Sequence, residues 1–200
     1  MIEIGEYTVT GLDFAIEGMR NPLNSWELSD SHDDTIGDKD LELAQRLRKA
    51  GTTHRKYLRQ IFVCMDILAP LYWWKEFDTY KVGTTSNSCS TMHKIHAKSF
   101  ELKDFSIDRL DDNQIETFRI VIDALNTARY NYNSTKVKDY WYQMIQLLPS
   151  SYNQLRTITM TYENALAMIE QRSSHKLKEW RMFCDILLNE LPYLKDFMNE

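Results

Sequence analysis

The chain has 200 residues, of which 43% are hydrophobic, and its formal net charge is −5. This length suits one domain with a real core, which we take to span residues 1–200. The acidic balance argues against a nucleic-acid or membrane-surface protein, since both kinds of surface need a basic face. No apolar run approaches the roughly 20 residues of a membrane span, and Met1–Glu6 lacks the apolar core of a signal peptide. Three widely spaced cysteines fit free thiols in a reducing cytosol, so we expect a cytoplasmic protein.

The first third of the chain is predicted to alternate strands and helices. Residues 6–10 form a strand, and a short helix from Leu12 ends near Gly18. A polar, turn-rich loop then leads to a helix over residues 39–50, which Asp38 is expected to cap and Gly51 to end. A buried strand over residues 61–68 follows, and Pro70 opens the next helix.

The rest of the chain is predicted to be mainly helical. After a looser stretch over residues 84–104, apolar residues at helical spacing begin near Asp112. A second helix covers residues 135–147, and β-branched alternation predicts a strand at residues 155–161. Helices over residues 163–171 and 175–191 close the chain. This order favours an α+β fold with a small, mostly antiparallel sheet and packed helices.

The segment 69–89 has the composition of a ligand pocket. It places two tryptophans and two tyrosines ahead of Lys81 and a run of hydroxyl side chains. A cation followed by hydroxyls and backbone amides can hold a phosphate group. The alternative is a solvated serine/threonine loop. The hydroxyl residues in this run are Thr84, Thr85, Ser86, Ser88 and Ser90.

Other candidate side chains have both a structural and a functional interpretation. Arg172 follows a predicted helix and could cap its carbonyls, or could fork onto a pyrimidine carbonyl or a carboxylate. His175 could simply be a first-turn residue of the last helix. The loop 19–26 could stack a heterocycle on Trp26, or could be a structural turn.

Metal and nucleophile chemistry have weaker signals. His93 and His96 are the only close histidine pair, and no third ligand of matching kind lies nearby, so we assign no metal site and keep a metal-dependent hydrolase as a minor alternative. Cys89 would need a histidine nearby in space to act as a nucleophile. Glycine-rich nucleotide loops are absent.

The segment 69–89 also resembles the signature of the flavin-dependent thymidylate synthases. That family has Ala-Pro after a strand and then an Arg-His-Arg triplet; here Ala69-Pro70 matches the start and Thr79-Tyr80-Lys81 falls on the triplet. Downstream, Arg172 falls on the arginine that holds the substrate pyrimidine in the family, and His175 matches a family histidine after a one-residue deletion. The pattern covers nearly the whole chain.

The resemblance implies an α+β homotetramer that binds FAD and deoxyuridylate (dUMP) in clefts between subunits. It implies methyl transfer to dUMP if the protein is active, with a non-catalytic nucleotide-binding or assembly protein as the alternative. The substrate-binding residues it implies are Arg172, Lys81, Thr84, Ser86, Ser88 and Cys89, and the cofactor-binding residues are Tyr80, Asn87, His175 and His54.

The chain departs from the family pattern at several charged positions. Only Lys81 keeps the charge of the Arg-His-Arg triplet, and Thr91 replaces an arginine that grips the nucleotide. Thr161 and Glu163 replace an asparagine and an arginine that bind flavin in the family. Glu163 would place a negative charge near the flavin diphosphate. The resemblance therefore supports the fold more strongly than the reaction.

Overall fold

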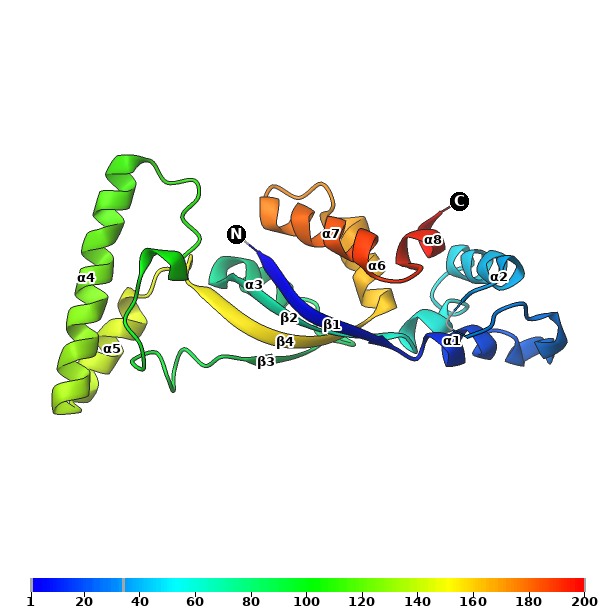
Figure 1. The fold of residues 1–200 in the computed structure, drawn as a ribbon, viewed down its shortest axis with the longest axis horizontal. Helices are drawn as coiled ribbons and strands as arrows, with labels where there is room; N and C mark the ends of the chain where they lie inside the picture. The colour runs from blue at the N-terminus through cyan, green and yellow to red at the C-terminus, as the bar shows by residue number, and fades with distance from the viewer. Residues whose placement is uncertain (1, 34, 200) are drawn as a thin grey trace. The chain divides into compact units, whose positions relative to one another are not determined.

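The computed structural model describes residues 2–33 and 35–199 (Figure 1). Its strands form one four-stranded antiparallel sheet in the order β1 (Glu3–Thr10), β2 (Phe62–Pro70), β4 (Asn153–Thr161), β3 (Thr85–Ser88). Eight α-helices accompany the sheet in the described residues, which confirms the predicted α+β class. Of these helices, none has the length and apolar character that would be needed to cross a membrane.

Strand β3 lies in a stretch that the sequence predicts as irregular. Its four residues, Thr-Ser-Asn-Ser, show no apolar alternation, and all of them are exposed. The strand exists because its backbone pairs with β4 at the edge of the sheet. Pairing of this kind leaves no mark in a pattern of hydrophobic residues.

The chain divides into two compact units, and the first contains residues 2–3, 67–79 and 87–156. Its helices are α3 (Leu71–Phe77), α4 (Asp112–Thr135) and α5 (Lys138–Leu147). The helices α4 and α5 pack against each other (Figure 1). The predicted second helix starts too early, because α4 continues to Thr135 and Lys136 then turns the chain in a left-handed conformation. The core of this unit consists of Ile95, Phe100, Phe105, Ile122, Leu125, Ala128 and Met144.

The second unit contains residues 4–66 apart from 34, 80–86 and 157–199. Its helices are α1 (Leu12–Gly18), α2 (Asp38–Lys49), α6 (Tyr162–Arg172), α7 (Lys178–Glu190) and α8 (Leu194–Met198). Helix α8 is missing from the sequence prediction because it is only five residues long; its buried Leu194 and Phe197 hold it in place. Other fully buried side chains here include Leu58, Ile61, Tyr162, Trp180, Phe183 and Leu187.

The start of helix α2 is capped by a residue other than the predicted one. Asp38 is the first helical residue, and Gly37 precedes it at the N-cap. The carboxylate of Asp30 instead accepts hydrogen bonds from the backbone N–H groups of Lys39 and Asp40, at 3.0 and 3.1 Å. A side chain at position 37 would collide with Asp30, since an added Cβ would lie 2.3 Å from its carboxyl carbon. The cap therefore comes from eight residues upstream.

A buried ion pair organises the loop between α1 and α2. Arg20 donates from Nε to Asp40 Oδ1 at 2.8 Å, and both residues are buried. Burial alone would raise the pKa of the Asp40 carboxyl, but hydrogen bonds from Ser29, Ser31 and Arg20 outweigh it and hold this pKa below its ordinary value. Trp26 in the same loop donates from Nε1 to Asn21 Oδ1 at 2.8 Å. These contacts favour the structural interpretation of the loop.

Candidate functional site

The side chains around Arg172 form the most chemically suggestive cluster in the second unit. Arg172 is the last residue of α6, and its Nε donates to the Tyr80 hydroxyl at 3.0 Å. That hydroxyl donates in turn to Gln171 Oε1 at 2.9 Å. The guanidinium carbon lies 5.1 Å from the ring centre of Trp180 and 5.7 Å from that of Tyr80. We call Tyr80, Gln171, Arg172, His175 and Trp180 the Arg172 cluster.

This geometry fixes the orientation of a positive charge among aromatic rings. A guanidinium group over an aromatic face gains cation–π attraction, and its planar fork is suited to carbonyl or carboxylate oxygens. The rings of Tyr80 and Trp180 are 5.9 Å apart. The cluster can therefore present a cation and flat surfaces to a heterocyclic ligand.

The turn from Tyr80 to Thr84 is fastened along helix α6. Asn164, in the first turn of α6, donates from Nδ2 to the Val82 carbonyl at 2.8 Å, and the Thr84 hydroxyl donates to the Tyr80 carbonyl. Gly83 has a φ of +78°, and an added Cβ would lie 2.6 Å from Asn164 Oδ1. Lys81, directly after Tyr80, is exposed. The turn thus places Lys81 next to the Arg172 cluster in the chain.

His175 lies in the link between α6 and α7, so its predicted position in the first turn of the last helix is wrong. Helix α7 begins only at Lys178, after Leu177 as its N-cap. The N–H of His175 donates to the Arg172 carbonyl at 3.0 Å, and its Nδ1 accepts from the Leu177 N–H at 3.2 Å. Its ring lies 6.3 Å from that of Trp180. The link itself thus brings His175 into the Arg172 cluster.

The remaining residues of the predicted phosphate loop lie on or beside strand β3. Ser86 belongs to the second unit, whereas Asn87, Ser88 and Cys89 belong to the first. All four residues are exposed. Cys89 donates its N–H to the Leu155 carbonyl at 2.9 Å, and its own carbonyl accepts from the Gln154 side chain at 2.7 Å. Backbone pairing with β4 therefore holds this end of the loop.

His54 lies elsewhere in the second unit, on a groove of about 830 Å³. Its lining combines apolar and basic side chains, and no carboxylate is among the lining residues. Its volume is within the range of small-molecule sites. The sequence analysis named His54 and the loop 19–26, which supplies Met19, Pro22 and Leu23, but it did not predict the groove, because the lining joins segments that are distant along the chain. The lining residues are Gly18, Met19, Pro22, Leu23, Leu43, Arg46, Leu47, Thr53, His54, Lys56, Tyr57, Arg59 and Gln60.

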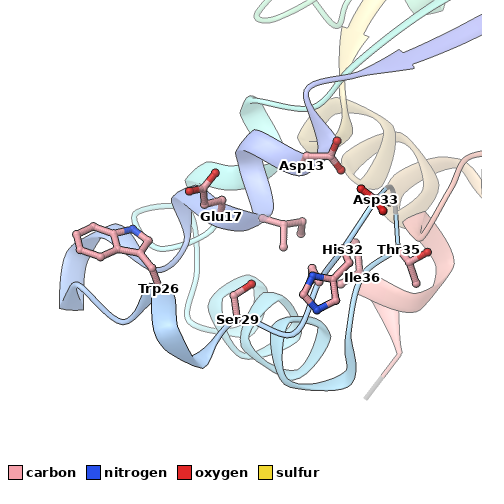
Figure 2. A pocket seen from close by; sticks show the side chains of 10 residues that line it. Asp13, Glu17, Trp26, Ser29, His32, Asp33, Thr35 and Ile36 are labelled. Atoms are coloured by element: carbon pink, nitrogen blue, oxygen red, sulfur yellow. The ribbon is translucent and has the colours of Figure 1, made fainter.

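A smaller pocket of about 290 Å³ lies between α1 and the loop that leads to α2 (Figure 2). Asp13, Glu17 and Asp33 supply carboxylates to its lining, and Trp26 and His32 supply rings. Across the residues described, no group of three or more histidine, cysteine, aspartate or glutamate side chains is arranged to hold a metal ion. The pocket is therefore an acidic hollow without a metal-binding arrangement.

His96, Cys64 and Cys184 are at least partly buried in the fold, whereas His93 is exposed. His96 packs its ring against Tyr132, with ring centres 4.9 Å apart, while His93 is exposed. Burial raises the pKa of the Cys184 thiol to about 11, which keeps this thiol protonated and unreactive at neutral pH. Cys64 is half-buried on β2.

Trp74, one of the two tryptophans in the segment predicted to have the composition of a pocket, is a buried core residue. Its side chain is fully buried, and its Nε1 donates to the Gln154 carbonyl at 2.9 Å. The Arg156 guanidinium lies 4.3 Å from its ring centre. The buried rings of Trp73 and Phe77 both contact the ring of Trp74, and sequence composition alone does not distinguish such a cluster from a pocket wall.

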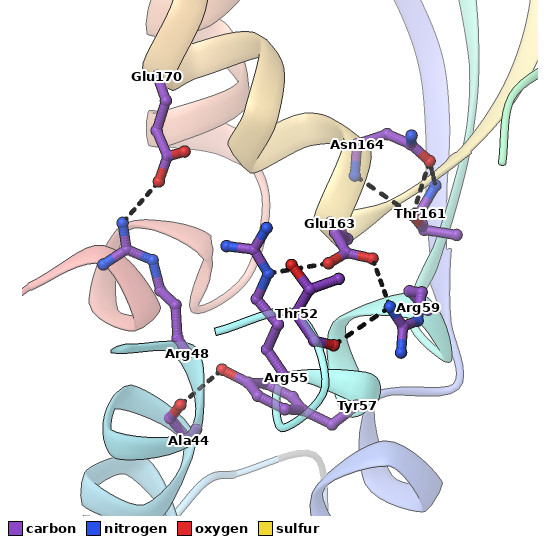
Figure 3. A network of polar contacts seen from close by, with 10 residues as sticks. All are labelled: Ala44, Arg48, Thr52, Arg55, Tyr57, Arg59, Thr161, Glu163, Asn164 and Glu170. Atoms are coloured by element: carbon purple, nitrogen blue, oxygen red, sulfur yellow. Dashed lines mark hydrogen bonds and ion pairs between the residues drawn. The ribbon is translucent and has the colours of Figure 1, made fainter. Parts of the chain in front are cut away.

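The residues at the start of α6 do not fit the flavin diphosphate that the family resemblance implies. Glu163 carries the negative charge there, and its carboxylate accepts hydrogen bonds from Arg55 at 2.8 Å and Arg59 at 3.2 Å (Figure 3). Thr161 caps the helix and exchanges hydrogen bonds with Asn164. The polar groups at this position are therefore bonded to one another.

Solved structures of the same fold are flavin-dependent thymidylate synthases. One from Helicobacter pylori, complexed with FAD and dUMP, has 21% identity and a TM-score of 0.70, over 98% of this chain and 97% of that chain. Another from the same organism, also with FAD and dUMP, has 21% identity and a TM-score of 0.69, over 100% of this chain and 96% of that chain. No protein-family profile and no curated protein sequence matches. At this identity the likeness establishes the fold.

Proposed function

We propose that this protein binds a pyrimidine nucleotide of the dUMP class at the Arg172 cluster. The observation that carries the proposal is the orientation of Arg172, which Tyr80 holds by a hydrogen bond and Trp180 by ring contact. Guanidinium N–H groups suit the carbonyl oxygens of a pyrimidine, and aromatic rings suit its flat faces. Similar structures solved with dUMP support this ligand class.

The phosphate end of such a nucleotide would meet the turn that follows Tyr80. In the proposal Lys81 supplies the cation, and Thr84, Ser86 and Ser88 supply hydroxyls, with Cys89 near the ligand. The family resemblance further supports a homotetramer in the cytoplasm, with the ligand in a cleft between subunits. Each of these assignments is part of the proposal.

Isothermal titration of the purified protein with dUMP tests the site. Arg172→Ala should weaken dUMP binding by about 10–100-fold, the loss expected for about 1.5–3 kcal/mol of charge-assisted hydrogen bonding. Arg119→Ala is the matched control, because Arg119 is an exposed arginine on α4 that pairs only locally with Glu116. Equal affinities for all three proteins would contradict the proposal.

A second candidate is flavin-dependent methyl transfer to dUMP, which the near-complete coverage of FAD-bound and dUMP-bound structures favours. A yellow preparation with flavin absorbance and dUMP-dependent NADPH oxidation would support it. A colourless protein that dUMP stabilises and FAD does not would leave a non-catalytic nucleotide-binding protein.

A further inference from the structure

Glu163 occupies the meeting point of two arginines and a helix start. Its side chain is 18% exposed, and each carboxylate oxygen has its own guanidinium partner: Oε1 accepts from Arg55 and Oε2 from Arg59 (Figure 3). Glu163 lies in the first turn of α6, where the helix dipole favours a negative charge. Three favourable electrostatic contacts therefore converge on one carboxylate.

Two arginines beside a helix N-terminus are also the kind of groups that proteins use to bind a phosphate-bearing ligand. Helix N-termini and paired arginines recognise phosphate through backbone N–H groups and forked guanidinium donors. Two backbone N–H groups at the start of α6 are already hydrogen-bonded: the Tyr162 N–H donates to the Ile61 carbonyl, and the Asn164 N–H donates to the Thr161 hydroxyl. A phosphate would thus meet occupied donors and a like charge.

The adjoining groove lacks such an internal anion. Arg59 pairs with Glu163 and also lines the groove, whose other lining residues include Arg46 and Lys56. The groove lining includes no carboxylate, and the acidic partner of Arg59 in the described residues is Glu163, which lies outside that lining. Removing the charge of Glu163 would release Arg59 toward an anion that lies in the groove.

We propose that Glu163 is a built-in counter-anion that closes a diphosphate-binding site formed by Arg55, Arg59 and the start of α6. The wild-type chain therefore excludes dinucleotides and other diphosphates from this position, and loss of the Glu163 charge opens it to them. This inference is independent of nucleotide binding at the Arg172 cluster. It gives the chain a means to select a mononucleotide and reject a dinucleotide.

The test uses inorganic pyrophosphate and FAD as probes, followed by calorimetry and thermal melting. Glu163→Gln should bind pyrophosphate at least about tenfold more tightly than the wild type, because two guanidinium groups lose their internal anion. Sodium sulfate at matched ionic strength controls for general salt stabilisation.

Glu170→Gln is the matched control variant. Glu170 is on the same helix, and its carboxylate accepts from Arg48 at 2.8 Å, so this change removes an equal charge and an arginine partner elsewhere. Its pyrophosphate affinity should equal that of the wild type. An equal gain in pyrophosphate affinity in both variants would show that the change in net charge causes it, and would overturn the proposal.

Pyrophosphate and FAD binding by the wild-type protein tests the proposal even if Glu163→Gln folds poorly. Wild-type protein that binds pyrophosphate or FAD stoichiometrically, whether or not it binds dUMP, would overturn the proposal. Adding Arg59→Gln to Glu163→Gln should abolish the gain, and persistence of the gain would likewise contradict it. Binding of dUMP, measured in parallel on the same samples, reports separately on the Arg172 cluster.

Discussion

The arginine side chains at the two ends of helix α6 have different partners. At its start, the Arg55 and Arg59 guanidinium groups are both paired with the Glu163 carboxylate of the chain itself. At its end, the Arg172 guanidinium contacts the Tyr80 hydroxyl and the rings of Tyr80 and Trp180. A carboxylate partner offsets the positive charge of an arginine, whereas an aromatic ring attracts the guanidinium group without adding a charge.

The comparison teaches that two arginine sites on one helix can differ in the partners that hold them. The similar solved structures hold two ligands, FAD and dUMP. Arg172, where the family resemblance implies a pyrimidine contact, lies at the end of α6, whereas Glu163, where it implies a flavin contact, forms ion pairs within the chain. We therefore expect the two ends of α6 to respond differently to nucleotide ligands.

The largest expected effect is a loss of unfolding free energy when the buried Arg20–Asp40 ion pair is broken. Asp40→Asn leaves Arg20 buried without its partner, and breaking a buried pair costs about 3–5 kcal/mol of unfolding free energy. Urea denaturation should show this loss, whereas Glu170→Gln, which removes a more exposed pair, should cost less than about 1 kcal/mol. Equal costs would show that the loop before α2 does not depend on this pair.

The same pair has a predictable pH dependence. The pKa of the folded Asp40 carboxyl is depressed, so its stabilisation is complete above the unfolded pKa of about 3.9 and is lost as pH falls through the lower folded value. Melting curves from pH 7 down to acid should therefore show a wild-type decline that Asp40→Asn lacks. Parallel declines in both proteins would assign the acid sensitivity to other groups.

The second effect concerns the end of α6. Arg172→Lys keeps the charge but loses the Nε donor to Tyr80 and the planar fork, so dUMP affinity should fall by about 1–2 kcal/mol, or about tenfold. Stability toward urea should change little. Unchanged affinity would mean that charge alone, without the fork, is sufficient for the ligand.

A third variant tests the turn that joins the two ends. Gly83→Ala should cost about 1–2 kcal/mol for a left-handed residue, and more because the new Cβ meets Asn164 Oδ1. Gly51→Ala is the matched control: Gly51 has a φ of +98° and no atom within 4 Å of an added Cβ. The difference between the two costs measures the Asn164 contact, and no difference would rule that contact out.

The smallest expected effect is that of the Tyr80 hydroxyl. Tyr80→Phe removes hydrogen bonds to Arg172 and Gln171 and should cost about 0.5–1.5 kcal/mol in dUMP binding. Tyr142→Phe, at a tyrosine with 52% exposure, controls for loss of a phenol. A larger loss than that of Arg172→Lys would make Tyr80, and not Arg172, the principal contact.

Sequence reasoning reached the fold class and most long elements because buried residues repeat at regular intervals. It missed β3 and α8, whose order depends on pairing and on two buried side chains, and it took Asp38 for a cap that Asp30 supplies. It identified Arg172 and Tyr80 by position, but their hydrogen bond spans 92 residues of sequence. The pairing of Glu163 with Arg55 and Arg59 was equally invisible, because no local pattern links residues about 100 positions apart.

The most direct test of the difference between the two ends of α6 is calorimetric titration of the wild-type protein with dUMP and with FAD, under identical salt conditions. The account predicts measurable dUMP binding, with FAD at least about tenfold weaker because Glu163 closes the diphosphate position. Stoichiometric FAD binding without dUMP binding would contradict it.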